Sequence, residues 1–404
     1  MSDRIVVVGA GHAAGQLVAR LRAEGLTGEI TLIGDEPMLP YQRPPLSKAY
    51  MAGEIGLDRV LLRNQAFYDD NQIELRASTK VARIDRAAAT VELDSGEQIE
   101  YANLVLATGA RARMLKLPGA DLDGIHCLRT VADADAIAAG VKRGARVAVV
   151  GGGYIGLEVA AVARTAGCEV TILEAMPRLL ARTTSEVMAN HVADVHQRHG
   201  VDIRYDAKVT GFAGDGTVTG VVLEDGTTLA AELVVVGIGV IANDDLAAAA
   251  GLAVDDGIVV DAAGVTADPK IWAIGDCTRH PSRLYGRNLR LESVHNAMTQ
   301  SRVVAANISG KSAIYDEIPW FWTDQYDFKL QSVGLPDAVD ETVVRGDPAS
   351  GTFTVFLLSA GRVVASESVN AMREHMDCRK LAGAQVTVSA ELLANPETNL
   401  KELL

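Results

Sequence analysis

One pattern constrains the fold more than any other, and it occurs twice: an apolar run, a glycine turn, a helical period and a second run that ends in an acid. The first copy begins at residues 4–11 (RIVVVGAG), and its second run ends before Asp35. The second copy begins at residues 146–153 (RVAVVGGG), and its second run ends before Glu174. Each copy predicts a buried parallel strand that leads into a helix N-terminus, the phosphate-binding half of a dinucleotide fold. The sequence therefore predicts two dinucleotide sites.

At each turn position of the two motifs, a physical reason requires glycine. The first glycine of each motif allows the tight turn, and the second lets the backbone approach a pyrophosphate at the helix N-terminus. These four positions are Gly9, Gly11, Gly151 and Gly153. The last motif position is Ala14 in one copy and Gly156 in the other, and the fingerprint accepts both. Structural glycines in a doubly wound fold that binds another ligand are the alternative, which the repetition of the motif disfavours.

The acids that end the second runs bear on cofactor choice. Asp35 and Glu174 are expected to accept hydrogen bonds from an adenosine ribose. A carboxylate at Glu174 suits a free 2′-hydroxyl and repels a 2′-phosphate, so NADH is favoured over NADPH. Arg178 and Arg182 follow shortly after and weaken that preference.

The rest of the chain predicts strands and one more unit. Residues 82–93 and 98–106 read as two strands around a turn, and residues 228–236 read as another strand. Beyond Pro319 the sequence pattern predicts paired strands, including residues 352–358 and 362–369. The predicted fold class is α/β, with two Rossmann-like domains of glutathione-reductase-like architecture and a C-terminal α+β domain.

Composition narrows the classes of partner. The net charge of −14 argues against nucleic acid as the main partner. No apolar run approaches the ~20 residues that cross a bilayer, and no signal peptide is visible, so a cytoplasmic location without membrane contact is expected. The cysteines lie far apart and indicate no metal site: Cys127, Cys168, Cys277 and Cys378. No sequence feature indicates an oligomeric state.

Several segments together resemble the NADH-dependent ferredoxin reductases of oxygenase systems, the family of the putidaredoxin and biphenyl dioxygenase reductases. The resemblance runs nearly end to end and includes the segment 319–326 (PWFWTDQY). The other segments are 9–14 (GAGHAA), 44–48 (PPLSK), 107–109 (ATG), 151–158 (GGGYIGLE), 273–276 (AIGD) and 292–294 (ESV). Spacing alone does not decide which site holds which cofactor. The resemblance implies FAD at the N-terminal fingerprint and NAD at the central one.

The resemblance also implies domain boundaries and cofactor contacts. FAD would be bound by residues 1–109 and 238–315, NAD by residues 110–237, and residues 316–404 would form the C-terminal domain. Asp276 would bind a ribityl hydroxyl of FAD, whereas taken alone it is equally a turn residue. The other residues expected at the cofactors are Gly9, Gly11, Ala13, Ala14, Asp35, Arg43, Lys48, Val81, Ala107, Thr108, Gly109, Arg129, Gly151, Gly153, Ile155, Gly156, Glu174, Arg182, Gly239, Val294 and Trp322.

Three residues are expected to act beside the flavin. In the family a lysine and a glutamate at the positions of Lys48 and Glu158 meet there, and such a pair would tune the isoalloxazine. Without the motifs, two unrelated surface charges would be the better interpretation. Tyr154 would stack on the flavin and move aside for nicotinamide, or would simply pack beneath the cofactor turn, and both interpretations stay open.

The tryptophans of the last segment also have two interpretations. Trp320 and Trp322 are alternate residues of a predicted strand, so their rings should share one face. They would form a wall beside the flavin and the ferredoxin surface, or would pack in the core of the third domain.

The expected activity is that of a ferredoxin reductase. Hydride would pass from NADH to FAD, and electrons would leave singly to a transiently bound [2Fe-2S] ferredoxin that serves a cytochrome P450 or a Rieske dioxygenase. Disulfide reductases of this architecture have a cysteine pair after the first acidic strand end, but residues 36–60 contain no cysteine. The alternatives are an NADH-dependent reductase of rubredoxin or of a small molecule, and a flavoprotein whose NADH binding controls a partner.

Overall fold

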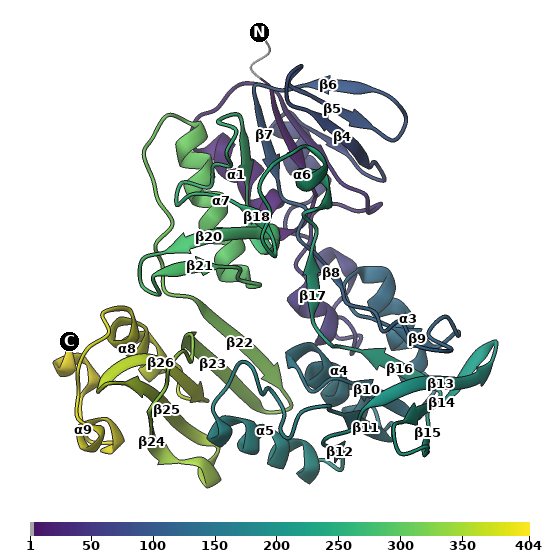
Figure 1. The fold of residues 1–404 in the computed structure, drawn as a ribbon, viewed down its shortest axis with the longest axis vertical. Helices are drawn as coiled ribbons and strands as arrows, with labels where there is room; N and C mark the ends of the chain where they lie inside the picture. Colours follow the sequence, from purple (N-terminus) through teal and green to yellow (C-terminus); the bar gives the residue numbers. More distant parts are fainter. Residues whose placement is uncertain (1–3) are drawn as a thin grey trace. The chain divides into compact units, whose positions relative to one another are not determined.

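The computed structural model describes residues 4–404, so residues 1–3 of the predicted FAD-binding domain lie outside the described residues. The chain forms two compact units, each composed of three segments. Unit 1 contains the chain up to Arg43, Gly56–Arg111 and Val240–Glu317, and unit 2 contains Pro44–Ile55, Ala112–Gly239 and Ile318–Leu404. Figure 1 shows the course of the chain. Among the described residues, no helix combines the length and the apolar character needed to cross a bilayer.

Unit 1 is built on a parallel sheet with the strand order β19-β7-β1-β2-β3. Every residue of β1 and β2 is buried, as expected for parallel strands that are covered on both faces. Helices α1 and α7 pack on one face, beside each other in Figure 1, and share a hydrophobic core with the sheet. The bounds are β1 (Ile5–Val8), α1 (His12–Ala23), β2 (Ile30–Ile33), β3 (Ile73–Arg76), β7 (Asn103–Leu106), β19 (Ile271–Ala273) and α7 (Val294–Ile308).

Smaller elements complete unit 1. An antiparallel sheet of β4, β5 and β6 shares a second core with the other face of the parallel sheet. Strands β18, β20 and β21 form another small sheet, and β8 pairs with β17. The bounds are β4 (Val81–Asp85), β5 (Thr90–Leu93), β6 (Gln98–Glu100), β8 (Ala110–Ala112), β17 (Val240–Ala242), β18 (Ile258–Val259), β20 (Thr278–Ser282), β21 (Arg287–Leu289), α2 (Gln65–Asp70) and α6 (Asp245–Ala249).

The predicted single strands over 82–93 and 98–106 are wrong, because each is two strands. The first is broken by a turn at residues 86–89, where Ala89 has a φ of 52° and the N–H of Ala88 donates to Asp85. The second leaves the antiparallel sheet after Glu100 and joins the parallel sheet at Asn103. No glycine or proline marks either break, so the apolar pattern alone gave no signal for them.

Unit 2 repeats the parallel design, with the strand order β12-β11-β10-β16-β9. The antiparallel sheet of β13, β14 and β15 precedes β16 in the chain, so the predicted single strand over 228–236 is wrong: it is broken at residues 231–232, where the chain changes sheets. The bounds are β9 (Ile125–His126), α3 (Val131–Lys142), β10 (Val147–Val150), α4 (Tyr154–Thr165), β11 (Val170–Leu173), α5 (Glu186–Arg198), β12 (Asp202–Arg204), β13 (Val209–Asp215), β14 (Thr217–Leu223), β15 (Thr228–Ala230) and β16 (Leu233–Val236).

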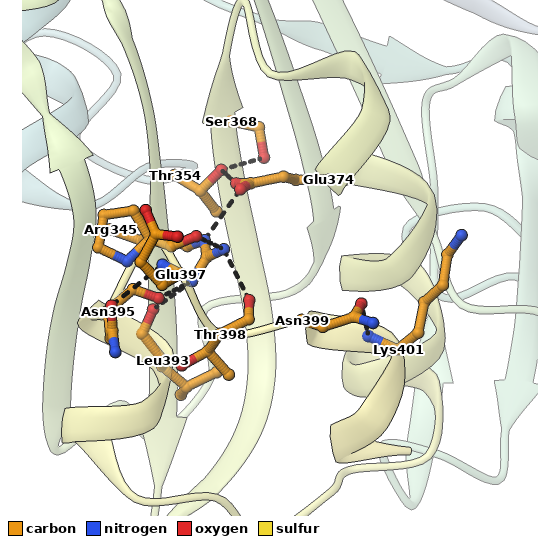
Figure 2. A network of polar contacts seen from close by, with 11 residues as sticks. Arg345, Thr354, Ser368, Glu374, Leu393, Asn395, Glu397, Thr398, Asn399 and Lys401 are labelled. Atoms are coloured by element: carbon orange, nitrogen blue, oxygen red, sulfur yellow. Dashed lines mark hydrogen bonds and ion pairs between the residues drawn. The ribbon is translucent and has the colours of Figure 1, made fainter.

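Residues 318–404 of unit 2 contain an antiparallel sheet with the order β22-β23-β26-β25-β24. One face packs against α8 and α9. The buried Arg345 holds this region together: its guanidinium pairs with Glu374 at 2.9 Å and donates to the carbonyls of Asn395 and Thr398 (Figure 2). The bounds are β22 (Trp320–Gln325), β23 (Phe328–Gly334), β24 (Glu341–Asp347), β25 (Thr352–Ser359), β26 (Arg362–Val369), α8 (Met372–Gly383) and α9 (Ala390–Ala394).

Candidate functional site

The two helices that follow the glycine turns begin without a side-chain cap. The N-cap residues are Gly11 for α1 and Gly153 for α4, and neither makes a side-chain cap hydrogen bond. In contrast, Thr130, Ser185 and Ser293 cap α3, α5 and α7 with their hydroxyl oxygens. Because the first-turn N–H groups of a helix need acceptors and favour negative charge, the uncapped ends of α1 and α4 suit phosphate groups.

The turn before α1 leaves room for such a ligand. Gly9 has a φ of 101°, and a Cβ there would lie 2.2 Å from the carbonyl oxygen of Ala107, so only glycine fits. A Cβ at Gly11 would meet no atom within 4 Å. Gly9 therefore makes the turn possible, and Gly11 leaves open space at the helix N-terminus. Ala14, one turn into α1, is completely buried.

The turn before α4 has the same geometry. Gly151 has a φ of 106°, and a Cβ there would lie 2.6 Å from the carbonyl oxygen of Gly237. A Cβ at Gly153 would meet only that same oxygen, at 3.8 Å, so this position is also open. Gly156 packs so tightly that a Cβ would lie 2.3 Å from the oxygen of Gly151. The donor sets of both turns fit the pyrophosphate of a dinucleotide.

The two acids occupy different environments. Asp35 follows β2 and is exposed. Glu174 follows β11, and its carboxylate accepts hydrogen bonds from the backbone N–H groups of Gly152 at 2.6 Å and Met176 at 2.8 Å. Glu174 is therefore oriented at the glycine turn, at the carboxyl end of a parallel strand where ligands of such sheets bind.

His12, the first residue of α1, is a site residue that sequence reasoning missed. Both ring nitrogens are buried and have no hydrogen-bond partner among the described residues. Burial lowers the pKa of His12, while the nearby charge of Asp276 opposes that shift. Because buried polar atoms normally have partners, unsatisfied nitrogens beside the phosphate-binding turn fit a polar ligand there. The signal in the sequence was a histidine inside the glycine motif.

Other predicted FAD residues of unit 1 gather around α1 and α7. Ala13 lies against the turn that carries Asp276, since a Cβ on Gly275 would lie 3.1 Å from that of Ala13. Ser301 of α7 donates to the carbonyl oxygen of Ala13 at 2.8 Å. Val294 is the first residue of α7, directly after its cap Ser293. The structure thus brings Ala13, Asp276 and α7 together.

The remaining predicted residues of unit 1 have these contacts. Thr108 donates to the carbonyl oxygen of Asn243 at 2.6 Å, and Arg43 pairs with Glu36 at 2.8 Å. Ala107 and Val81 are buried, and Gly109 has a φ of 64°. Lys48 and Arg129 belong to unit 2.

Unit 2 contains the predicted ion pair. Lys48 Nζ lies 2.7 Å from Glu158 Oε1, and the Glu158 side chain is only 2% exposed. Two residues that the sequence did not indicate also donate to this carboxylate, namely Ser47 to Oε2 and Thr323 to Oε1 at 2.6 Å. A buried carboxylate with three donors is satisfied and held in one orientation. The two charges therefore form a specific ion pair, held in place by further hydrogen bonds, and are not unrelated surface groups.

Aromatic rings lie on β22 beside α4. The ring of Tyr154 lies 4.4 Å from that of Phe321, and burial raises the pKa of the Tyr154 hydroxyl. The rings of Trp320 and Trp322 lie 5.3 Å apart, so the prediction that they share a face is confirmed. Trp322 is half-buried.

The last predicted residues of unit 2 lie in α4 and in the loops after β16, before α5 and before α3. The side chain of Arg182 approaches Gly239, whose added Cβ would lie 3.8 Å from Nη2. Ile155, beside Tyr154 in the first turn of α4, is exposed. Arg129 is half-buried, and its backbone N–H donates to Asp133 at 3.0 Å.

The fold and the site together define a class of protein. Two parallel sheets each present an open, uncapped helix N-terminus after a glycine turn, and one unit holds an ion pair between a half-buried lysine and a buried glutamate. The four cysteines are all free, so no disulfide supplies a redox group. This is the architecture of an oxidoreductase that binds two dinucleotides.

Known proteins identify the family within that class. Residues 3–301 match the pyridine nucleotide-disulphide oxidoreductase family, and residues 320–404 match the reductase C-terminal family. Rhodocoxin reductase of Rhodococcus erythropolis is 45% identical over 398 residues, which cover 98% of this chain and 93% of that protein. The chain belongs to the ferredoxin reductases of the pyridine nucleotide-disulphide oxidoreductase family.

Two solved structures have the same fold. The ferredoxin reductase for the CYP199A2 system from Rhodopseudomonas palustris is 43% identical, with a TM-score of 0.96 and 99% coverage of both chains. The covalent complex of putidaredoxin reductase with putidaredoxin is 41% identical, with a TM-score of 0.96 and coverage of 99% of this chain and 98% of that one. The predicted family, fold class, enzyme class and cofactor types are thereby confirmed.

Proposed function

We propose that this chain carries electrons from NADH through FAD to a [2Fe-2S] ferredoxin, which serves a cytochrome P450 or a Rieske dioxygenase. The observation that carries the proposal is the ion pair of Lys48 with the buried Glu158 in a chain with two open dinucleotide turns. Bound FAD supplies the change from two-electron to one-electron transfer. No cysteine lies in residues 36–60, so that segment has no thiol that could act as a redox group.

Each of the two dinucleotide-binding domains has its own cofactor in this proposal. Residues 1–109 and 238–315 bind FAD, residues 110–237 bind NAD, and residues 316–404 form the C-terminal domain. The N-terminus of α1 binds the FAD pyrophosphate with its free N–H groups, and His12 provides a further polar contact. Asp276 accepts from a ribityl hydroxyl. The other predicted cofactor residues are proposed to line FAD or NAD, as the family resemblance implies.

The family resemblance implies that the lysine–glutamate pair would supply a positive charge to the flavin. Glu158 is buried and fixed by three donors, so it holds Lys48 Nζ in place through their 2.7 Å contact. An ammonium fixed in this way would stabilise negative charge on a reduced flavin. Lys48, Glu158 and Tyr154 therefore act by positioning and tuning rather than as nucleophiles.

NADH is the proposed electron donor because of Glu174. Its carboxylate is oriented by Gly152 and Met176 at the second glycine turn. There it would accept from a ribose 2′-hydroxyl and repel a 2′-phosphate.

The proposed partner is an acidic ferredoxin, bound transiently in the cytoplasm. The solved complex of putidaredoxin reductase, 41% identical to this chain, contains the ferredoxin putidaredoxin. Arg63 and Arg302 are the proposed docking charges, and both are exposed on unit 1. Arg302 also pairs with Glu317 at 2.6 Å, and the Arg63 guanidinium lies over the ring of Phe67. Such rim charges mainly raise the rate of association.

The test is NADH oxidation by the purified FAD-loaded protein with cytochrome c as reporter. Recombinant putidaredoxin serves as the [2Fe-2S] probe, and a rubredoxin and a no-carrier reaction serve as comparisons. Fast reduction of cytochrome c with putidaredoxin, but not with rubredoxin or without a carrier, supports the proposal. Faster turnover with rubredoxin would favour a rubredoxin reductase, and tight NADH binding with slow turnover on all acceptors would favour a binding role.

A further inference from the structure

Glu158 is the end point of a buried chain of polar contacts in unit 2. Gln325 Nε2 donates to Thr323 Oγ1 at 3.1 Å, and Thr323 Oγ1 donates to Glu158 Oε1 at 2.6 Å. His196 Nε2 lies 2.7 Å from Gln325 Oε1. All four side chains are at most 2% exposed. A polar chain so deeply buried is costly unless every member is satisfied.

The contacts have one direction. The amide N–H of Gln325 donates to Thr323, so the amide oxygen that faces His196 accepts, and His196 Nε2 carries the hydrogen. Burial lowers the pKa of His196 to about 4, so the ring is neutral near pH 7. The other ring nitrogen, Nδ1, is then an acceptor, and the hydroxyl of Tyr326 lies 3.4 Å from it.

This direction determines what Thr323 does. Its oxygen accepts from Gln325, so its single hydroxyl hydrogen points to Glu158 Oε1. That same oxygen atom of Glu158 receives Lys48 Nζ, while Ser47 donates to the other one. Thr323 thus shares one carboxylate oxygen with the lysine.

We propose that Thr323 is a positioning residue for electron entry, which fixes the Glu158 carboxylate and through it the ammonium of Lys48. His196 and Gln325 set the direction of its hydroxyl. This inference rests on the proposed function, in which the lysine–glutamate pair tunes the flavin. It assigns to strand β22 of the C-terminal domain a part in the chemistry, because Thr323 is a residue of that strand.

The test compares Thr323→Val, which removes the hydroxyl, with Thr323→Ser, which keeps it. Both are examined as FAD-loaded protein by single-turnover flavin reduction with NADH, by the midpoint potential of the flavin and by thermal unfolding. We expect Thr323→Val to slow flavin reduction about tenfold and to shift the potential, because a hydrogen bond to a charged group is lost. The Kd of NADH should change little, and Thr323→Ser should restore the rate and the potential.

Thr354 provides a matched control. It is also completely buried, lies in the same sheet and donates to a glutamate, Glu374, at 3.1 Å (Figure 2). Thr354→Val should lower the unfolding temperature and leave the flavin potential and reduction rate unchanged. If Thr323→Val and Thr354→Val have the same effects, or if Thr323→Ser is as slow as Thr323→Val, the inference is overturned.

Two further variants complete the test. Gln325→Met removes the hydrogen bonds of Gln325 to His196 and Thr323 and leaves the contact between Thr323 and Glu158 intact. It replaces Thr323→Val in the test if that variant does not fold. We expect it to shift the flavin potential in the same direction as Thr323→Val. Glu158→Gln separates this inference from the proposed function. If Glu158→Gln changes the potential and Thr323→Val and Gln325→Met do not, only the inference fails. If none of the three changes it, the proposed role of the lysine–glutamate pair fails as well.

Discussion

Glu174 accepts a 2.6 Å hydrogen bond from the backbone N–H of Gly152, so the acid that ends the second fingerprint also holds its glycine turn. The same carboxylate accepts from Met176 with its other oxygen. In the proposed function, this one side chain would combine support of the turn with discrimination against a 2′-phosphate.

The cofactor preference should change when this carboxylate is neutralised. Glu174→Gln should lower kcat/KM for NADH about tenfold and lower the value for NADPH much less, because the repulsion of a 2′-phosphate is removed. Steady-state kinetics with both nucleotides measures this, with the exposed Glu224→Gln as the control. An equal loss for both nucleotides would show that Glu174 only supports the turn.

Stability should depend on pH through Glu367. Burial raises the pKa of this carboxyl to about 7 from an ordinary 4.5, against the opposing effects of the Ser185 donors and the charge of Arg178. Between these values the folded state binds more protons than the unfolded state, so stability falls as the pH rises from about 4.5 to about 7. Glu367→Gln removes that penalty. The unfolding temperature of Glu367→Gln should therefore rise relative to wild type between pH 5 and pH 8.

The measurement is thermal unfolding of both FAD-loaded proteins over that pH range. Glu367 also accepts from the Ser185 N–H at 2.9 Å, and a glutamine oxygen replaces only one such acceptor. The two proteins will then differ by a constant offset as well, which does not affect the slope. A difference in unfolding temperature that stays flat across the range would contradict the assignment.

The docking charges should act on association with ferredoxin alone. Reversal of both, as Arg63→Glu with Arg302→Glu, should slow putidaredoxin reduction steeply at low salt and leave NADH-to-ferricyanide activity alone. Arg204→Glu is the control, because this arginine is exposed on unit 2. Stopped-flow reduction at two ionic strengths makes the comparison, and unchanged ferredoxin kinetics in the double variant would exclude these two arginines as docking charges.

The sequence predicted those features that depend on local pattern. Buried runs such as residues 4–8 and the glycine turns gave the parallel strands and both helix N-termini, because each is specified by neighbours in the chain. The breaks inside 82–93 and 98–106 were missed, because neither the turn within the antiparallel sheet at 86–89 nor the change of sheets after Glu100 contains a glycine or proline.

The partners of Glu158 were missed for a different reason. Ser47 is 111 residues away from it in the chain and Thr323 is 165 residues away, so only the tertiary fold brings these hydroxyls together. Lys48 was found through the family resemblance and not through any pattern of charge. A serine or threonine in isolation gives no sign that it will donate to a buried carboxylate, because such residues are common at caps and turns as well.

Substitution of the two glycines of the first turn by alanine should affect different properties: stability at Gly9 and FAD affinity at Gly11. Gly9→Ala places a Cβ 2.2 Å from the Ala107 oxygen at a φ of 101°, so it should destabilise the protein. The backbone strain alone costs about 1–3 kcal/mol. Gly11→Ala meets no protein atom within 4 Å, so the fold should tolerate it. Its methyl group would instead occupy the space proposed for the FAD pyrophosphate at α1, and FAD affinity should fall about tenfold or more.

Unfolding temperature and FAD affinity, measured on each variant after removal and titration of the cofactor, separate the two effects. Gly9→Ala should unfold at lower temperature even without FAD, since its clash is with the protein itself. Gly11→Ala should match wild type without FAD and differ only when FAD is added. If Gly11→Ala bound FAD as tightly as wild type, the open space at the N-terminus of α1 would not be the pyrophosphate site. The role of this turn in the electron path would then have to be reassigned.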